Sequence, residues 1–229
     1  LLRIINSFFD KSTFFSDCVK YPHLVEIIVT ISSSSNFLTD ILVRNPEFIH
    51  LVLKDDFLNN KIFRDDLENE IELKAKSLLS TTLYVEYLKF LQRKYLFKIG
   101  LRDILKISNL VETIDDISIL AYSLTSKIFD KTFAEVSKKY GLETIDNKHV
   151  IIALGKMGGN ELNYSSDIDL IVFFDSEEKF PDQNKYYSEI LIESIQQFTK
   201  LTSENTNGGF LYRVDFRLRP DEKFSTLAR

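Results

Sequence analysis

Glycine is distributed so unevenly along the 229 residues that it divides the chain into two stretches. Gly100 is the only glycine among residues 1–140, and the other six lie between Gly141 and Gly209. In the glycine-poor stretch, apolar residues recur every three or four positions, which is the spacing of an amphipathic helix. We therefore expect residues 1–145 to form an all-helical domain whose apolar stripes pack into its core.

Several helices of this first domain can be located from local signals. Pro22 and Pro46 suit the first turn of a helix, because that turn does not use the backbone N–H that proline lacks. Another helix is expected over Leu83–Ile99. Its inward-facing residues are expected to be Leu88, Leu91, Tyr95 and Leu96.

The last helix of this domain carries signals at both of its ends. Thr113 is followed three residues later by Asp116, as in a capping box that begins a helix. Gly141 can end the helix, since glycine adopts the left-handed conformation that such ends require. The buried face is expected to comprise Ile117, Leu120, Leu124, Ile128 and Val136.

The pattern changes after Asp146 and predicts a second domain over residues 146–229. Val150–Leu154 is an apolar, β-branched run of strand length that ends in a glycine turn. The glycine turn, Gly155–Gly159, is expected to lead into a short helix over Asn160–Leu162. A second strand is expected over Ile168–Phe174, a longer helix over Asn184–Thr202 and a third strand over Phe210–Leu218. The fold class is therefore α+β, a helical domain followed by a mixed sheet flanked by helices.

Composition excludes several classes of protein. The 29 Lys and Arg against 34 Asp and Glu give a net charge of −5, which argues against general binders of duplex DNA or anionic membranes. Cys18 is the only cysteine, so a disulfide framework is impossible. The histidines His23, His50 and His149 lack metal-ligand spacing, and no apolar run has membrane-spanning length. We expect a cytoplasmic protein with neither a nucleic acid nor a membrane as partner.

Two carboxylates at the start of an apolar strand carry the first sign of chemistry. Asp167 and Asp169 are two residues apart, so their side chains leave the same face of the strand. Two adjacent carboxylates repel each other unless a cation joins them, and hard oxygen ligands suit Mg²⁺ or Mn²⁺. Taken alone, such a tripeptide is more typical of a solvated strand start or a turn than of a metal site, because such tripeptides are common. The opposite face would pack into the core through Ile168, Leu170, Val172 and Phe174.

The glycine turn before these carboxylates strengthens the functional interpretation. Its sequence, GKMGG, lets backbone N–H groups approach a phosphate closely, although it is not a Walker A loop. Ser165 and Ser166 lie between the turn and the carboxylates and offer hydroxyl groups to the same phosphate. The candidate phosphate-binding residues are Gly155, Lys156, Gly158, Gly159 and Ser166.

The third strand, YRVDFRLRP, supplies a third acid. Asp215 shares one face of this strand with Arg213, Arg217 and Arg219, and apolar residues occupy the other face. The charged face is either a surface ion-pair ladder of little energy or part of a site. If the strand neighbours Ile168–Phe174, Asp215 would complete a metal site and the arginines would reach phosphate oxygens. Such a site is typical of two-metal phosphoryl or nucleotidyl transfer.

Two long segments resemble a known family. LGKMGGNELNYSSDIDLIVFF (Leu154–Phe174) and YRVDFRLRPD (Tyr212–Asp221) are similar to the paired signatures of the glutamine synthetase adenylyltransferases, within the nucleotidyltransferase superfamily. RKYLFKIGLRDIL (Arg93–Leu105) resembles the N-terminal half of that family. The resemblance implies a nucleotidyltransferase-type sheet domain and control of glutamine synthetase through AMP on one of its tyrosines.

The resemblance also implies a reaction and its ligands. In the family, the N-terminal half removes AMP by phosphorolysis and releases ADP, while the C-terminal half attaches AMP from ATP. The helical lead-in and the SSDIDL motif favour removal here, with attachment as the alternative. The implied metal ligands are Asp167, Asp169 and Asp215, holding Mg²⁺ or Mn²⁺. The glycine turn and Ser166 would bind phosphate and nucleotide (ATP, ADP or AMP), while Arg217 and Arg219 would steady the third strand.

The implied partners are glutamine synthetase and a PII-type nitrogen-signalling protein. One departure from the family follows RLRP, where a turn of the form Asp-Gly-x-Ser-Gly-Pro is usual. Here Asp221–Arg229 lacks both glycines and the proline, so its backbone reaches the same angles less easily. This departure motivates a second hypothesis, a nucleotide-sensing binding module without turnover.

A third hypothesis is a template-independent RNA polymerase of the same superfamily, such as a tRNA-end-adding enzyme. The negative net charge argues against it, because a nucleic-acid substrate normally requires a cationic groove. The chain begins with Leu1 and stops at Arg229, so we expect a fragment whose second domain is truncated at its C-terminal end.

Overall fold

The computed structural model describes residues 1–78, 80–142, 146–175, 178–180, 184–206, 208–216 and 227–228, with the backbone alone at 55, 227 and 228. It divides into two compact units. The first comprises Leu1–Ile62 with Arg93–Ile117, and the second comprises Phe63–Gln92 with Ser118–Arg229. The expected division into residues 1–145 and 146–229 stays a prediction.

Short helices build the first unit. Pro22 is the first residue of its helix, as predicted, and Pro46 begins a 3₁₀ helix. Buried apolar side chains such as Leu24, Ile31 and Phe48 form the core of this unit. The short elements are α1 (Leu2–Ser7), α2 (Lys11–Lys20), α3 (Pro22–Ser34), α4 (Asn36–Arg44), η1 (Pro46–Leu53) and α5 (Asp55–Asn59).

Two long helices, α7 (Thr81–Ile104) and α8 (Leu110–Lys139), contribute residues to both units. The helix predicted over Leu83–Ile99 is confirmed, since it lies within α7. Gly141 ends α8 as predicted, with a φ of 72° and its N–H donating to the carbonyl of Lys138 at 2.9 Å. The predicted inner face of α8 is buried at Ile117, Leu120, Leu124, Ile128 and Val136. No helix in the described residues is long and apolar enough to cross a membrane.

The start of α8 corrects a prediction. Its capping box is Asn109 with Glu112, because Asn109 Oδ1 accepts the N–H of Glu112 at 2.9 Å and Glu112 Oε2 accepts the N–H of Asn109 at 3.2 Å. The capping box predicted at Thr113 and Asp116 is wrong. Both residues lie inside the helix and are buried, and Asp116 instead accepts a hydrogen bond from the N–H of Ile62. The amide of Asn109 fulfils the role expected of the Thr113 hydroxyl.

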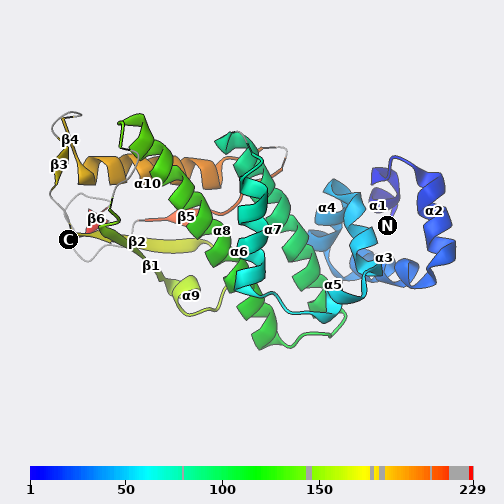
Figure 1. Cartoon of the computed structure of the whole chain (residues 1–229). Helices are drawn as coiled ribbons and strands as arrows, with labels where there is room; N and C mark the ends of the chain where they lie inside the picture. The colour runs from blue at the N-terminus through cyan, green and yellow to red at the C-terminus, as the bar shows by residue number, and fades with distance from the viewer. Residues whose placement is uncertain are drawn as a thin grey trace. The chain divides into compact units, whose positions relative to one another are not determined.

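A small mixed sheet lies in the second unit (Figure 1). Strand β2 (Ile168–Phe174) is central and pairs antiparallel with β1 (His149–Leu154). On its other edge, β2 pairs in parallel with β5 (Val214–Asp215) and β6 (Leu227–Ala228). Strands β3 (Lys179–Phe180) and β4 (Lys185–Tyr186) form a separate antiparallel pair that the sequence did not predict. The long helices and this sheet confirm the α+β class.

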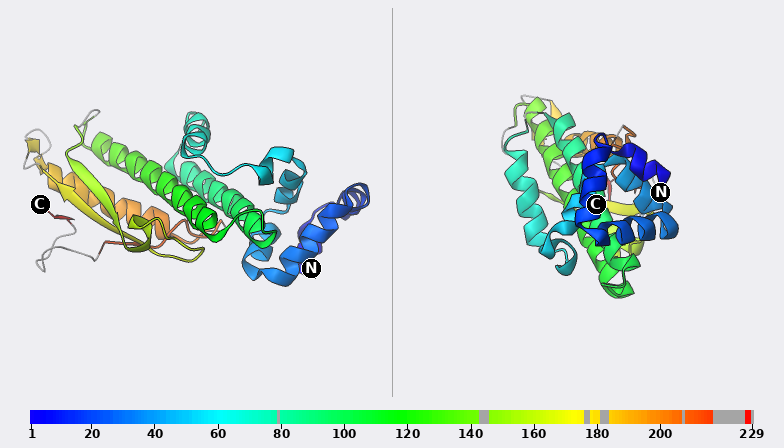
Figure 2. Two further views of the ribbon diagram at one scale, coloured as in Figure 1. Left: turned by 90° about the horizontal axis from the view of Figure 1, so that it is seen from below. Right: turned by 90° about the vertical axis from the view of Figure 1, so that its right-hand side faces the viewer.

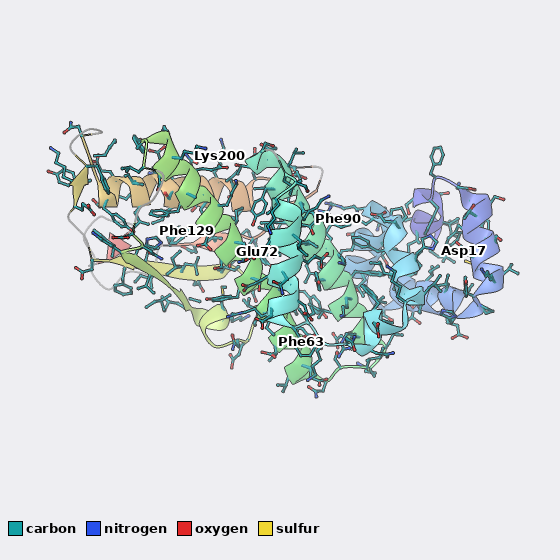
Figure 3. All side chains as sticks on the ribbon, viewed as in Figure 1. Asp17, Phe63, Glu72, Phe90, Phe129 and Lys200 are labelled. Carbon is teal, nitrogen blue, oxygen red and sulfur yellow. The ribbon has the colours of Figure 1, made fainter. Side chains whose placement is uncertain are left out.

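Helices cover one face of the sheet. Figures 1 and 2 show α10 (Tyr187–Ser203) lying along the sheet and α8 crossing it. Phe129 of α8, labelled in Figure 3, extends towards the sheet and lies 5.5 Å from the ring of Phe198 on α10. Lys127 of α8 pairs at 2.5 Å with Glu72, which belongs to α6 (Arg64–Ala75) and is labelled in Figure 3. Apolar and aromatic packing therefore fixes α8 and α10 against the strands.

Two predicted elements of the second domain differ in the structure. The short helix is not at Asn160–Leu162 but is the glycine turn itself, α9 (Gly155–Gly158), and Asn160 has a φ of 53° outside it. The third strand is shorter than predicted, because β5 is limited to Val214–Asp215 within the described residues. Ahead of β5, Phe210 is 46% exposed and Leu211 is 1% exposed, which reverses the predicted alternation.

Candidate functional site

The sheet brings two of the predicted acids side by side. In the parallel pairing of β2 with β5, Ile168 is opposite Val214 and Asp169 is opposite Asp215. Residues opposite each other on neighbouring strands share one face, and such strands lie about 4.8 Å apart. Asp169 and Asp215 are both half-buried. The second and third predicted strands are therefore neighbours in the sheet at Asp169 and Asp215.

Gly155 allows the carboxylate of Asp169 to take its position. In the antiparallel pairing of β1 with β2, Leu154 lies opposite Asp169, so Gly155 follows directly at the edge of the carboxylate. Gly155 has a φ of +55°, and a Cβ atom there would lie 2.6 Å from Oδ2 of Asp169. No side chain larger than hydrogen fits this contact without displacing the carboxylate.

The other two glycines of the turn differ from each other. A Cβ atom on Gly158 would lie 2.5 Å from the carbonyl oxygen of Ala153, so this glycine lets α9 fold back against β1. A Cβ atom on Gly159 would meet nothing closer than 3.6 Å, and its φ is −87°. Close approach therefore requires glycine at 155 and 158 but not at 159. The assignment of phosphate binding to this turn and to Lys156 stays a prediction.

Asp167 has a cationic neighbour that the sequence analysis did not pair with it. Nε of Arg213 lies 2.7 Å from Oδ1 of Asp167, and both side chains are more than half exposed. The N–H of Ile168 donates to the carbonyl of Arg213 at 2.9 Å, which continues the β2–β5 ladder by one residue. The alternation of the third strand predicted that Arg213 and Asp215 share one face. The pairing of Arg213 with Asp167 could not be predicted from it, because it depends on the register between β2 and β5.

Ser166 is engaged in the loop that leads to β2. Its hydroxyl donates to Oδ1 of Asn163 at 2.9 Å and accepts the backbone N–H of Asn163 at 3.0 Å. The same Oδ1 accepts the N–H of Ser165 at 3.0 Å. Asn163 thus shapes the turn before the carboxylates, and its local signal was an asparagine followed by serines. Phosphate binding by Ser166 stays a prediction.

The carboxylates suit a divalent cation by their chemistry, because Mg²⁺ and Mn²⁺ prefer hard oxygen donors. No group of three or more His, Cys, Asp or Glu side chains within the described ranges is arranged to hold a metal ion. Asp167 instead faces Arg213. The three-acid metal site therefore stays a prediction. The predicted Arg217 and Arg219 lie outside the described residues.

Comparison with known proteins identifies the family of this chain. A family model described as glutamate-ammonia ligase adenylyltransferase matches residues 25–229. The chain belongs to this family. The match spans both sequence segments that carried the resemblance, including the acids of β2 and β5.

Individual adenylyltransferases of the family are similar along most of the chain. A protein of Thioalkalivibrio sulfidiphilus is 26% identical over 229 residues, which cover 96% of this chain and 23% of the relative. Proteins of Psychromonas ingrahamii and Shewanella frigidimarina are each 31% identical and cover 81% of this chain and 20% of the relative. All three are named bifunctional glutamine synthetase adenylyltransferase/adenylyl-removing enzyme. The chain spans about a fifth to a quarter of their length.

Proposed function

We propose that this chain carries a nucleotidyl-transfer site that removes AMP from a tyrosine of glutamine synthetase. In this reaction an oxygen of inorganic phosphate attacks the phosphorus of the AMP group, and the bond from that phosphorus to the tyrosine oxygen breaks. The products are ADP and the free tyrosine, whose hydroxyl takes the proton that phosphate loses. The names of the relatives support both a transferase and an adenylyl-removing activity.

The observation that carries this proposal is the meeting of Asp169, Asp215 and Gly155 where β2 begins, with Gly155 on one side of Asp169 and Asp215 on the other. Two carboxylates on neighbouring strands concentrate negative charge where a cation is needed to balance it. A divalent cation bound there would neutralise charge on the phosphate groups during transfer. The residues proposed to hold it are Asp169 and Asp215, joined by Asp167.

Arg213 is proposed to change partners when the site is filled. Its pair with Asp167 is exposed, and exposed ion pairs contribute about 0–1 kcal/mol, so the exchange is inexpensive. Once Asp167 turns to a cation, the guanidinium would be released beside the reacting phosphate. Arginine binds phosphate oxygens through two parallel N–H donors, which suits this role. Arg213 would thus hold the incoming phosphate.

The test is an assay for ADP with adenylylated glutamine synthetase, Mg²⁺ and phosphate. It uses both this chain and the longest natural form of the protein that contains it. We expect ADP from the wild-type protein and none from the Asp169→Asn variant. Equal ADP from both would contradict the proposal, and AMP attachment from ATP without any ADP release would overturn the direction. A PII-type signalling protein stays a proposed second partner on the family resemblance alone.

A further inference from the structure

A pocket of about 270 Å³ lies in the second unit, on the face of the sheet that α8 and α10 cover. Its walls include Phe129 from α8, Phe198 from α10 and Met157 from α9. Each of these three side chains is at most 6% exposed, so the walls are firmly packed. The floor comes from Ala153 and Leu170, which lie opposite each other in the β1–β2 pairing. The pocket is large enough for a small organic molecule.

This pocket is distinct from the carboxylate site. Side chains alternate between the two faces of a strand, so Leu170 points away from the face that carries Asp169. On β1, Ala153 lies opposite Leu170 and shares its face, whereas Leu154 lies opposite Asp169 and shares the other face. Met157 connects the two faces, because it lies in α9 between Gly155 and Gly158. A molecule in the pocket therefore contacts the back of the turn whose first residue borders Asp169.

His149 lines the pocket and is held from behind by a tyrosine. Nδ1 of His149 lies 2.7 Å from the hydroxyl of the fully buried Tyr187, which also accepts the N–H of Lys148 at 3.0 Å. When the hydroxyl donates its single proton to Nδ1, a neutral imidazole carries its own proton on Nε2. His149 is then neutral, and its burial lowers the pKa of the ring in agreement.

Asp130 gives the pocket its charge. It is the one carboxylate among the lining residues, and neither lysine nor arginine lines the pocket in the described part of the chain. Lys127, one turn earlier on α8, is already held by Glu68 at 3.6 Å and Glu72 at 2.5 Å. Asp130 is exposed, and the positive charge of Lys127 acts on it without a salt bridge between the two described residues. A negative charge beside aromatic walls favours a flat cation over a neutral or anionic molecule.

We propose that this pocket binds a small flat organic cation, an aromatic amine or amidine, with its ring against the apolar wall that includes Phe129 and its charged nitrogen at Asp130. The ligand differs in class from the phosphates and nucleotides of the proposed reaction, and its site lies across the sheet from them. Because Met157 borders the pocket, a bound molecule is expected to shift α9 and thereby to change the position of Asp169 in the carboxylate site.

The experiment uses benzamidine as the probe and benzamide as a neutral control of nearly the same shape. Met157 is the only methionine of the sequence, so ¹³C-methyl-methionine labelling places one NMR signal in the pocket wall, assigned by its loss in Met157→Leu. We expect benzamidine to shift this signal saturably, with a dissociation constant of about 1 mM, and benzamide to bind at least about fivefold more weakly.

Two variants make the outcome decisive. Ser126 lines the pocket from the middle of α8, and Ser126→Leu is expected to fill the space and abolish the shift. Asp130→Asn keeps the shape and is expected to make benzamidine and benzamide bind alike. Their thermal unfolding is compared with wild type to verify that they fold. Absence of a saturable shift in the wild-type protein would overturn the site, and equal binding of the two probes to it would overturn the cationic class.

Discussion

The two faces of β2 are built from alternating residues of one short strand, and they differ in chemistry where the strand begins. One face carries Asp169 beside Asp215 and Gly155. The other carries Leu170 and Val172, which are 4% and 0% exposed under α8 and α10. Packing on the second face holds the strand in place, and that rigidity positions the carboxylate on the first. Changes on the two faces should therefore fail in different ways.

The sharpest test of this division substitutes two adjacent residues of β2, one on each face, in separate variants. Asp169→Asn is expected to lower turnover by about 10³-fold while changing stability little, because the proposed cation loses a charged ligand. Leu170→Ala is expected to lower the free energy of unfolding by about 2–4 kcal/mol and to leave turnover per folded molecule nearly unchanged. Steady-state kinetics and urea unfolding of both variants measure the two effects. Loss of turnover alone in Leu170→Ala would break the division.

The glycine turn offers the second test, with a control inside the same turn. Gly155→Ala is expected to destabilise the protein by about 2 kcal/mol and to displace Asp169, because alanine is strained at a φ of +55° and its Cβ meets Oδ2. Gly159→Ala is expected to change stability by less than about 0.5 kcal/mol, since nothing lies within 3.6 Å. Equal behaviour in urea unfolding and turnover would contradict the contact with Asp169.

A smaller effect is expected at the exposed ion pair. Arg213→Gln frees Asp167, so we expect divalent-cation binding to tighten about threefold while the KM for phosphate rises about tenfold. These opposite signs distinguish a change of partner from a purely structural pair. Calorimetric titration with Mn²⁺ and phosphate-dependent kinetics measure them, and Arg213→Lys serves as the charge-conserving control. Weaker cation binding in Arg213→Gln would refute the exchange.

The smallest effect concerns pH and the helix-covered face. Burial lowers the pKa of His149 below its ordinary value of 6.5, so the unfolded chain binds a proton more readily than the folded chain. This contribution to stability is present above pH 6.5 and is lost as the pH falls through that value. In His149→Gln, the drop in unfolding free energy from pH 8 to pH 5 should therefore be smaller than in the wild-type protein. Urea unfolding at both pH values checks it.

The sequence predicted the fold where one local pattern determines it. Strand Ile168–Phe174 was placed correctly because a short, nearly continuous apolar run is typical of a buried strand. The third strand was overextended, because residues ahead of β5 follow a turn set by distant contacts. The N–H groups of Leu211 and Tyr212 both donate to the carbonyl of Thr202, at 2.9 and 3.0 Å. Alternation alone does not reveal such a contact.

The residues of the candidate site could be chosen from local patterns, but their contacts could not. Asp169 and Asp215 were chosen from strand patterns, and the parallel register places them opposite each other. The ion pair of Asp167 with Arg213 and the contact of Gly155 with Asp169 depend on register and on a positive φ, which residue types do not specify. Gly155 admits the carboxylate of Asp169, and the binding of a phosphate by the glycine turn stays a prediction.

The central claim is that Asp169 and Asp215 act as one cation site, and Mn²⁺ binding tests it most directly. The measurement is Mn²⁺ titration followed by electron paramagnetic resonance, with paramagnetic broadening of the Met157 methyl signal as a second readout. We expect saturable binding in the wild-type protein, and at least tenfold weaker binding when either acid alone is changed, in Asp169→Asn or Asp215→Asn. Wild-type affinity in either variant would contradict the account.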